Sequence, residues 1–237
     1  MKITILYDNS SLDSYIRYGW GFSCLIDDRI LFDTGESPGA LFHNMHCLGL
    51  DAETIEAVVI SHDHWDHTGG LWNLLEKRNG LTVYGCPGFG EDFKRRVSEL
   101  KGRLIESAAF RKIDSRISLT GEVSGKYRGA VMPEQALMAK TESGIVVITG
   151  CSHPGIADMV ARVKAVYPAE PVALVLGGFH LKDEGKEKIE AAASDLIRAG
   201  VLKVAPTHCT GQDAQSLFQD RFAGRYLSVC AGSRLEI

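Results

Sequence analysis

The sequence predicts a mixed α/β fold in which short buried strands alternate with helices. Short apolar runs such as residues 57–60 stop at polar residues or glycine, which is typical of buried strands. Longer segments that begin or end at proline or glycine lie between these runs and have the length of helices. The order of strands, polar loop and helix in the first half recurs in the second. Because 237 residues with 45% hydrophobic content can bury one full core, we expect a single domain over residues 1–237.

The expected strands are apolar or alternating runs that turn residues separate. Residues 2–7 alternate in polarity, and the polar residues 8–11 then predict a turn. Asp27-Asp28 stands between two apolar runs, which is the pattern of a hairpin. In chain order, strands are expected over residues 2–7, 22–26, 29–32, 57–60, 81–86, 137–140, 144–148, 172–176, 201–205 and 225–229. Residues 103–145 as a whole are expected to be mostly strands and turns.

The expected helices are the longer segments between these strands. Pro38 suits a first helical turn, Gly49 follows the end of that segment, and Gly80 ends the segment that begins at Leu71. In chain order, helices are expected over residues 38–48, 71–77, 90–101, 156–167, 186–199 and 212–222. These patterns by themselves predict layers of helix and sheet and no particular topology.

Composition excludes several classes of protein. Charged residues make up 24% and the net charge is -4, which argues against a disordered chain and against a nucleic-acid partner. No apolar run approaches the roughly twenty residues that span a bilayer, so no membrane association is expected. The six cysteines form no C-x-x-C pair, and we therefore expect reduced thiols in a cytoplasmic protein. They are Cys24, Cys47, Cys86, Cys151, Cys209 and Cys230.

The polar stretch 61–70 directly follows the apolar run 57–60 and holds the clearest chemical signal. His62, His64, Asp66 and His67 lie within six residues of one another, and imidazole nitrogens and carboxylate oxygens are good ligands for zinc and related ions. In extended chain alternate residues face the same side, so His62 and His64 can bind one ion together. Asp66 and His67 follow where the chain turns into a helix and could hold a second ion. A solvated polar loop is the alternative, and the density of these residues argues against it.

This His-x-His-x-Asp-His pattern resembles the signature of the metallo-beta-lactamase superfamily, and the resemblance extends over nearly the whole chain. It implies a four-layer αββα sandwich. It also implies that Asp33, in the segment Asp33-Thr34-Gly35, supports the ligand loop from behind. The alternative for Asp33 is a residue that caps a turn, which is compatible with that role.

Three further histidines, His153, His180 and His208, each follow an apolar run. The segments around His153 and His208 are similar to the superfamily motifs whose histidines complete the two metal sites. The resemblance therefore implies a binuclear centre of two divalent ions, with Zn²⁺ as the first choice and Mn²⁺ or Fe²⁺ as alternatives. One ion is expected on His62, His64 and His153, and the other on Asp66, His67 and His208.

The sequence departs from the superfamily between these motifs, where relatives usually place an aspartate that bridges both ions. Here that strand leads to His180, and a neutral imidazole has one free lone pair and cannot bridge two cations. The alternatives for His180 are weak binding of one ion and a role as an acid/base or substrate contact. We take His180 and Asp66 as the candidate catalytic residues. Cys151 is a weaker candidate for a metal ligand, and a small buried residue is the alternative.

The segments that contain His153, His180 and His208 resemble a subfamily that includes the dihydropterin-ribofuranosylaminobenzene phosphate synthases. The resemblance implies a hydrolase or transferase that acts on a small anionic, phosphorylated molecule. A metal-bound hydroxide would serve hydrolysis, because zinc lowers the pKa of water to about 7, and metals that hold a leaving diphosphate would serve the synthase reaction. The alternatives are a non-catalytic metal or ligand sensor and a phosphodiesterase or nuclease.

Overall fold

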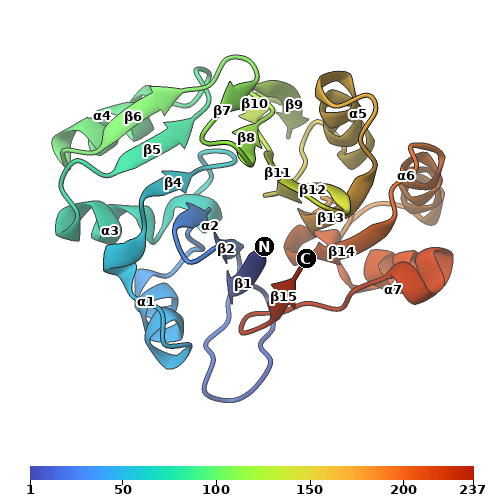
Figure 1. Ribbon diagram of the computed structural model, residues 1–237, viewed down its shortest axis with the longest axis horizontal. Helices are drawn as coiled ribbons and strands as arrows, with labels where there is room; N and C mark the ends of the chain where they lie inside the picture. The colour runs from blue at the N-terminus through green and yellow to red at the C-terminus, as the bar shows by residue number, and fades with distance from the viewer. The chain divides into compact units, whose positions relative to one another are not determined.

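The computed structural model describes residues 1–237 and assigns its two large sheets to two units of the chain (Figure 1). The first unit comprises residues 1–108 and 230–237, and the second comprises residues 109–229. Both units combine strands and helices, which confirms the predicted α/β class. None of the helices has the length and apolar character that crossing a membrane requires.

The first unit is built on a seven-stranded sheet in the order β15-β1-β2-β3-β4-β5-β6. The strands from β15 to β3 pair antiparallel, and those from β3 to β6 pair parallel. Their bounds are β1 Lys2–Tyr7, β2 Ser23–Ile26, β3 Ile30–Phe32, β4 Ala57–Val59, β5 Thr82–Gly85, β6 Arg103–Glu106 and β15 Arg234–Glu236. Its helices are α1 Pro38–Cys47, α2 Trp65–Thr68, α3 Leu71–Lys77 and α4 Glu91–Glu99, with a 3-10 turn at η1 Ala52–Thr54.

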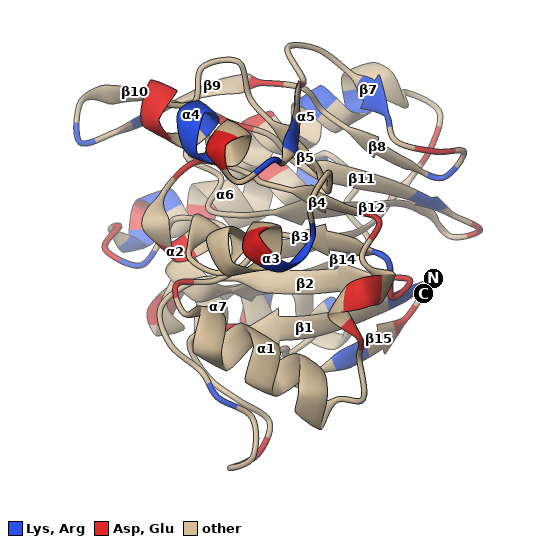
Figure 2. Cartoon of the chain, turned by 90° about the vertical axis from the view of Figure 1, so that its left-hand side faces the viewer, with Lys and Arg blue, Asp and Glu red and all other residues tan.

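Helices α1 and α3 cover one face of this sheet and lie in front of β1, β2 and β3 in Figure 2. Leu41 and Met45 of α1 and Leu74 of α3 are buried together with Leu6 and Leu31 of the sheet, because one stripe of each helix is apolar. The same view colours both acidic and basic residues on α4, the pattern of a solvated helix face.

The second unit is built on a six-stranded sheet in the order β14-β13-β12-β11-β8-β7 and a separate two-stranded sheet of β9 and β10. The strands of the large sheet are β7 Arg111–Lys112, β8 Ile117–Leu119, β11 Leu137–Thr141, β12 Gly144–Thr149, β13 Val172–Gly178 and β14 Lys203–Thr207. The small sheet is the hairpin of β9 Val123–Tyr127 and β10 Ala130–Glu134. The helices are α5 Ile156–Val166, α6 Lys186–Arg198 and α7 Gln212–Phe222, with 3-10 turns at η2 His208–Thr210 and η3 Ala223–Arg225.

Parallel pairing of β12, β13 and β14 brings three strand ends to one edge of the second sheet. Thr149 pairs with Gly177, and Gly178 pairs with Thr207, so the loops that follow these three strands leave the sheet side by side. Helices α5, α6 and α7 each follow one of these loops and lie beside this sheet in Figure 1. The histidines predicted as ligands in this half of the sequence therefore come from adjacent loops.

The strands and helices agree with the sequence-based expectations within a few residues, with one exception. The strand expected over residues 225–229 is wrong, because that segment makes only an isolated bridge between Tyr226 and Val204. The last strand is β15, which pairs antiparallel with β1. Its three residues include two charged side chains and pair with the opposite end of the chain, so no local pattern indicates it.

Candidate metal centre

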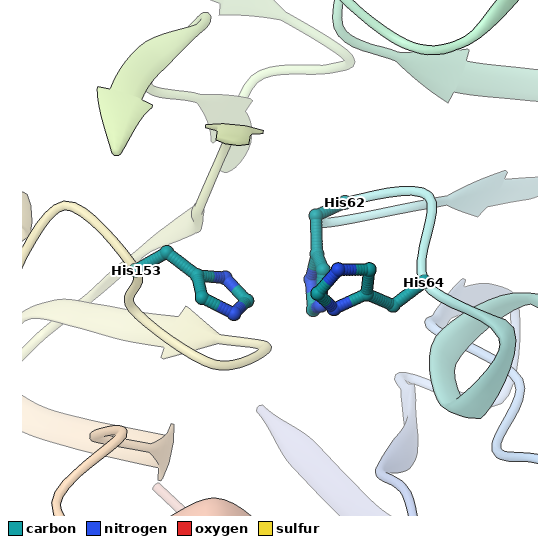
Figure 3. Close-up of side chains that lie close together, drawn as sticks. All are labelled: His62, His64 and His153. Carbon is teal, nitrogen blue, oxygen red and sulfur yellow. The ribbon is translucent and has the colours of Figure 1, made fainter. Parts of the chain in front are cut away.

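In the first unit, the predicted ligands lie on the loop that follows β4 and on the short helix α2. The ring centres of His62 and His64 are 4.7 Å apart, and those of His62 and His67 are 4.1 Å apart. Figure 3 shows the rings of His62 and His64 next to each other. Asp66 Oδ2 is 3.6 Å from His67 Nε2. The first unit thus brings its four predicted ligands into one cluster.

Asp33 fixes the orientation of this cluster from the end of β3. Its carboxylate accepts hydrogen bonds from Ser61 N, Ser61 Oγ and His67 Nδ1, each at 2.7 Å. Burial raises the pKa of Asp33, and these contacts with His67 and Ser61 oppose the rise. Because His67 donates through Nδ1, its Nε2 carries the lone pair that a metal needs. Ser61 Oγ lies 2.9 Å from His62 Nδ1 and extends the same arrangement to that ring.

Glu134 has the same function in the second unit, at the end of β10. Its Oε1 accepts from the backbone N–H groups of Cys151 and Ser152 at 2.9 and 2.7 Å. Its Oε2 accepts from His153 N at 2.8 Å and from His153 Nδ1 at 3.0 Å. Burial raises the pKa of Glu134, but the hydrogen bonds from His153 and Ser152 outweigh burial and hold the pKa below its usual value. His153 (Figure 3) therefore also presents Nε2 for a metal.

His180 and His208 follow β13 and β14 and lie on loops that are tied together. Leu181 N and Lys182 N both donate to Cys209 O, at 3.2 and 3.1 Å. The ring centre of His180 lies 4.5 Å from that of His153. His180 and His208 adopt φ values of 51°, a left-handed conformation that is unfavourable for residues other than glycine and is often retained at functional sites.

Two cysteines lie among these histidines. The ligand atoms of Cys151, His153 and His180 lie within 4.8 Å of one another, and so do those of Cys151, His208 and Cys209. Burial raises the pKa of the Cys209 thiol, but contacts with Cys151, His208 and His180 lower it by more, so the pKa lies well below its usual value. The hydrogen bond to Cys209 in turn raises the pKa of His180.

A pocket of about 520 Å³ adjoins His153 and His180 within the second unit. Tyr127 of β9 forms part of its wall, with its ring centre 5.3 Å from that of His153 and 5.7 Å from that of His180. Three basic residues, Lys126, Arg128 and Lys188, and two acidic ones, Glu184 and Asp195, also line it. Ion pairs join Glu184 to Lys188 and Asp195 to Arg198. The pocket thus combines aromatic surface and positive charge beside two candidate site histidines.

Both units therefore supply residues that could hold a metal ion. Histidines that hydrogen-bond through Nδ1 to buried carboxylates, with aspartate and cysteine beside them, are suitable for zinc and similar divalent ions. The sequence pattern indicated the histidines and Asp66 as candidate ligands but did not indicate Glu134 or Cys209. Glu134 gave no local signal, because it stands in a strand-like segment far from the histidines in sequence. Cys209 directly follows His208, and that adjacency could have indicated it.

Comparisons with known proteins agree with this fold. The model of the beta-lactamase superfamily domain matches residues 28–125. A solved metal-dependent hydrolase of the beta-lactamase superfamily is 31% identical, with a TM-score of 0.84 over 100% of this chain and 99% of that chain. The metallo-beta-lactamase fold protein YhfI from Bacillus subtilis is 17% identical, with a TM-score of 0.71 over 99% of both chains, and agrees in fold.

Among curated proteins, the chain is similar to 7,8-dihydropterin-6-methyl-4-(beta-D-ribofuranosyl)-aminobenzene-5'-phosphate synthase of Methanocaldococcus jannaschii. The two are 29% identical over 246 residues, which cover 87% of this chain and 84% of the synthase. These matches confirm the α/β, metallo-beta-lactamase-like fold class and the resemblance stated from the sequence. The chain belongs to the metallo-beta-lactamase superfamily and is an enzyme of that fold.

Proposed function

We propose that the enzyme is a metal-dependent hydrolase or transferase that acts on a small anionic, phosphorylated molecule. The observation that carries the proposal is the pocket beside His153 and His180, where Lys126, Arg128 and Lys188 outnumber the two acidic lining residues. A phosphate or carboxylate group would be held by these cations, and a planar part of the same molecule would contact the Tyr127 ring. The volume of about 520 Å³ suits a small molecule better than a polymer.

We further propose that two divalent ions bind the ligand sets expected from the sequence, with Zn²⁺ as the first choice and Mn²⁺ or Fe²⁺ as alternatives. His62, His64 and His153 would hold one ion, and Asp66, His67 and His208 the other. Membership of the superfamily supports this assignment, as do the buried carboxylates that orient His67 and His153. When bound, such ions lower the pKa of water and stabilise negative charge on phosphoryl oxygens.

The proposed roles of the protein groups follow from their placement. His180 lines the pocket, so its imidazole ring would hold or accept a proton during the reaction. Asp66 lies beside His67 and would act both as a ligand and as an acceptor that orients the reacting group. Lys188, paired with Glu184 at 2.6 Å, would bind the anionic end of the substrate.

The second candidate is a reaction like that of the dihydropterin synthase, in which a diphosphate leaves. Similarity to the curated synthase at 29% identity favours this candidate, and the same basic pocket would hold the departing diphosphate. A non-catalytic sensor is not favoured, because the relatives with known activities are enzymes. The substrate panel described next distinguishes phosphodiesterase activity from these candidates, and an assay with RNA and DNA distinguishes nuclease activity.

The test is a panel of phosphate monoesters, phosphodiesters, diphosphates and uncharged esters, assayed with metal-supplemented protein. We expect turnover of a small phosphorylated compound, and Lys188→Ala should raise its KM about tenfold, equivalent to loss of about 1.4 kcal/mol of binding. Lys203→Ala is the matched control, because Lys203 is an exposed residue of the same unit and does not line the pocket. Equal KM values for the two variants, or turnover of uncharged esters alone, would contradict the anionic substrate.

His180→Ala tests the proton-transfer role in the same assay. We expect turnover to fall on the order of 10²–10⁴-fold with metal content unchanged, as for loss of one acid/base group. Loss of a metal ion in step with activity would make His180 a ligand, and full activity would exclude a role in the reaction.

A further inference from the structure

Cys151 occupies the central place among the donor atoms of the second unit. Its Sγ belongs to the group with His153 and His180, and also to the group with His208 and Cys209. Within each group, all ligand atoms lie within 4.8 Å of one another. Cys151 therefore belongs to both groups. One group contains His153, a proposed ligand of the first ion, and the other contains His208, a proposed ligand of the second.

We propose that the Cys151 thiolate bridges the two metal ions and takes the place of the aspartate that the sequence lacks; the inference rests on the two-ion centre proposed above. A thiolate sulfur has lone pairs for two cations, whereas a neutral imidazole such as that of His180 has only one. Zn–S and Zn–N bonds of about 2.3 and 2.0–2.1 Å place two donors on one tetrahedral ion about 3.6 Å apart. Separations below 4.8 Å to His153 on one side and His208 on the other are compatible with such a bridge.

The backbone holds Cys151 in this position. Its N–H donates to Glu134 Oε1 at 2.9 Å, which is the same carboxylate that orients His153. Gly178 allows the end of β13 to approach closely, since a Cβ atom there would lie 2.3 Å from Gly150 O and 3.3 Å from Cys151 Cα. The Cys151 side chain is 3% exposed, so its sulfur faces other donors and not solvent.

Cys209 is the natural comparison because it is also buried and lies in one of the two groups. Its Sγ donates to Cys151 O at 3.7 Å, and it does not belong to the group that contains His153. A bridge between the ions of His153 and His208 is therefore expected from Cys151 and not from Cys209. A small buried side chain without a metal bond is the alternative role for Cys151.

The test replaces zinc by Co²⁺ in the purified full-length protein and records the thiolate-to-cobalt charge-transfer absorption together with metal content. Wild type and Cys209→Ser should show the band. Cys151→Ser should lose the band and fall from about two ions per chain to about one. Cys151→Asp should lack the band but keep both ions, because a carboxylate can also bridge.

The outcomes separate this inference from the proposed function. Two bound ions without a thiolate band in wild type would overturn the Cys151 bridge and leave the two-metal enzyme in place. A band that persists in Cys151→Ser and disappears in Cys209→Ser would assign the bond to Cys209 and also overturn the inference. Wild-type protein that binds no metal at all would overturn the proposed function, and the inference with it.

Discussion

Asp33 and Glu134 are the residues on which both donor clusters depend. Each is a fully buried carboxylate at or just after a strand end, and each accepts at least one hydrogen bond from a backbone N–H and one from Nδ1 of a histidine. Each carboxylate thereby fixes the fold of a ligand loop and the tautomer of a ligand. A change at either residue should therefore affect stability and metal affinity together.

Replacement of Glu134 tests this coupling. We expect Glu134→Gln to lower the free energy of unfolding by about 3 kcal/mol. The amide nitrogen of Gln would replace one carboxylate oxygen. Either the N–H groups of Cys151 and Ser152 or the N–H and ring of His153 would then lose their acceptor. Zinc affinity should fall about 10–100-fold, as for other residues that orient a ligand. Glu142→Gln, at an exposed position, is the control and should change stability by less than about 0.5 kcal/mol. Denaturant unfolding and zinc titration measure the two effects, and a stable variant with unaltered zinc affinity would contradict them.

The pH dependence of the same variant follows from the direction of the pKa shift. The pKa of Glu134 in the folded protein lies below its usual value of 4.5, so its stabilisation is fully present above that value. It is lost as the pH falls through the lower folded-state pKa. Metal-free wild type should therefore lose more stability than Glu134→Gln in this acid range. The raised pKa of Asp33 has the opposite effect on the pH dependence of stability. Because Asp33 is present in both proteins, its effect cancels when the two are compared.

At the scale of elements, the close approach of β13 to the loop after β12 brings the second cluster together. Gly178 pairs with Thr207, and its N–H donates to Gly150 O at 3.1 Å. Ser152 Oγ donates to Gly178 O at 2.8 Å. No side chain larger than that of glycine fits between these segments, because the atoms that it would meet include backbone.

Gly178→Ala should destabilise the protein by about 1–3 kcal/mol, the usual effect of an additional methyl group in a closely packed site. The added Cβ would lie 2.6 Å from Cys209 Sγ and 2.3 Å from Gly150 O. Gly224→Ala is the matched control, since a Cβ there meets nothing within 4 Å and its φ is not positive. Thermal unfolding of the two variants measures the effect. Equal melting temperatures would show that β13 and the loop after β12 can move apart without loss of stability.

At the scale of the whole molecule, bound metal should stabilise the folded chain, because the donor clusters form only when the protein folds. At a free zinc concentration 100 times the dissociation constant, the free energy of unfolding should rise by about 2.7 kcal/mol. His153→Ala should reduce this gain. His43→Ala should keep it, since His43 lies on α1 and hydrogen-bonds Tyr15 O. Calorimetry with zinc and with a chelator measures the gain, and identical curves would argue against a metal enzyme.

The sequence predicted the fold class and the histidines because both leave local signals. Apolar runs marked the strands, and His153, His180 and His208 stand directly after such runs. Glu134 and the last strand β15 were missed for one physical reason. Their partners, His153 and β1, are distant in sequence, and nothing in the neighbouring residues reveals the pairing. The single domain over residues 1–237, the assignment of ligands to two ions and the roles of His180 and Asp66 remain predictions.

The β9–β10 hairpin has a consequence for how such enzymes diverge. Its strands form a sheet of their own, joined by Arg128 and Gly129, both with positive φ. Its last residue, Glu134, anchors the ligand loop, whereas its tip supplies Lys126 and Arg128 to the pocket wall. If the pocket binds the substrate as proposed, mutations and insertions at the tip should alter substrate preference while the anchor remains intact. In directed evolution, the tip is the segment to randomise when a new substrate is wanted without loss of the catalytic centre.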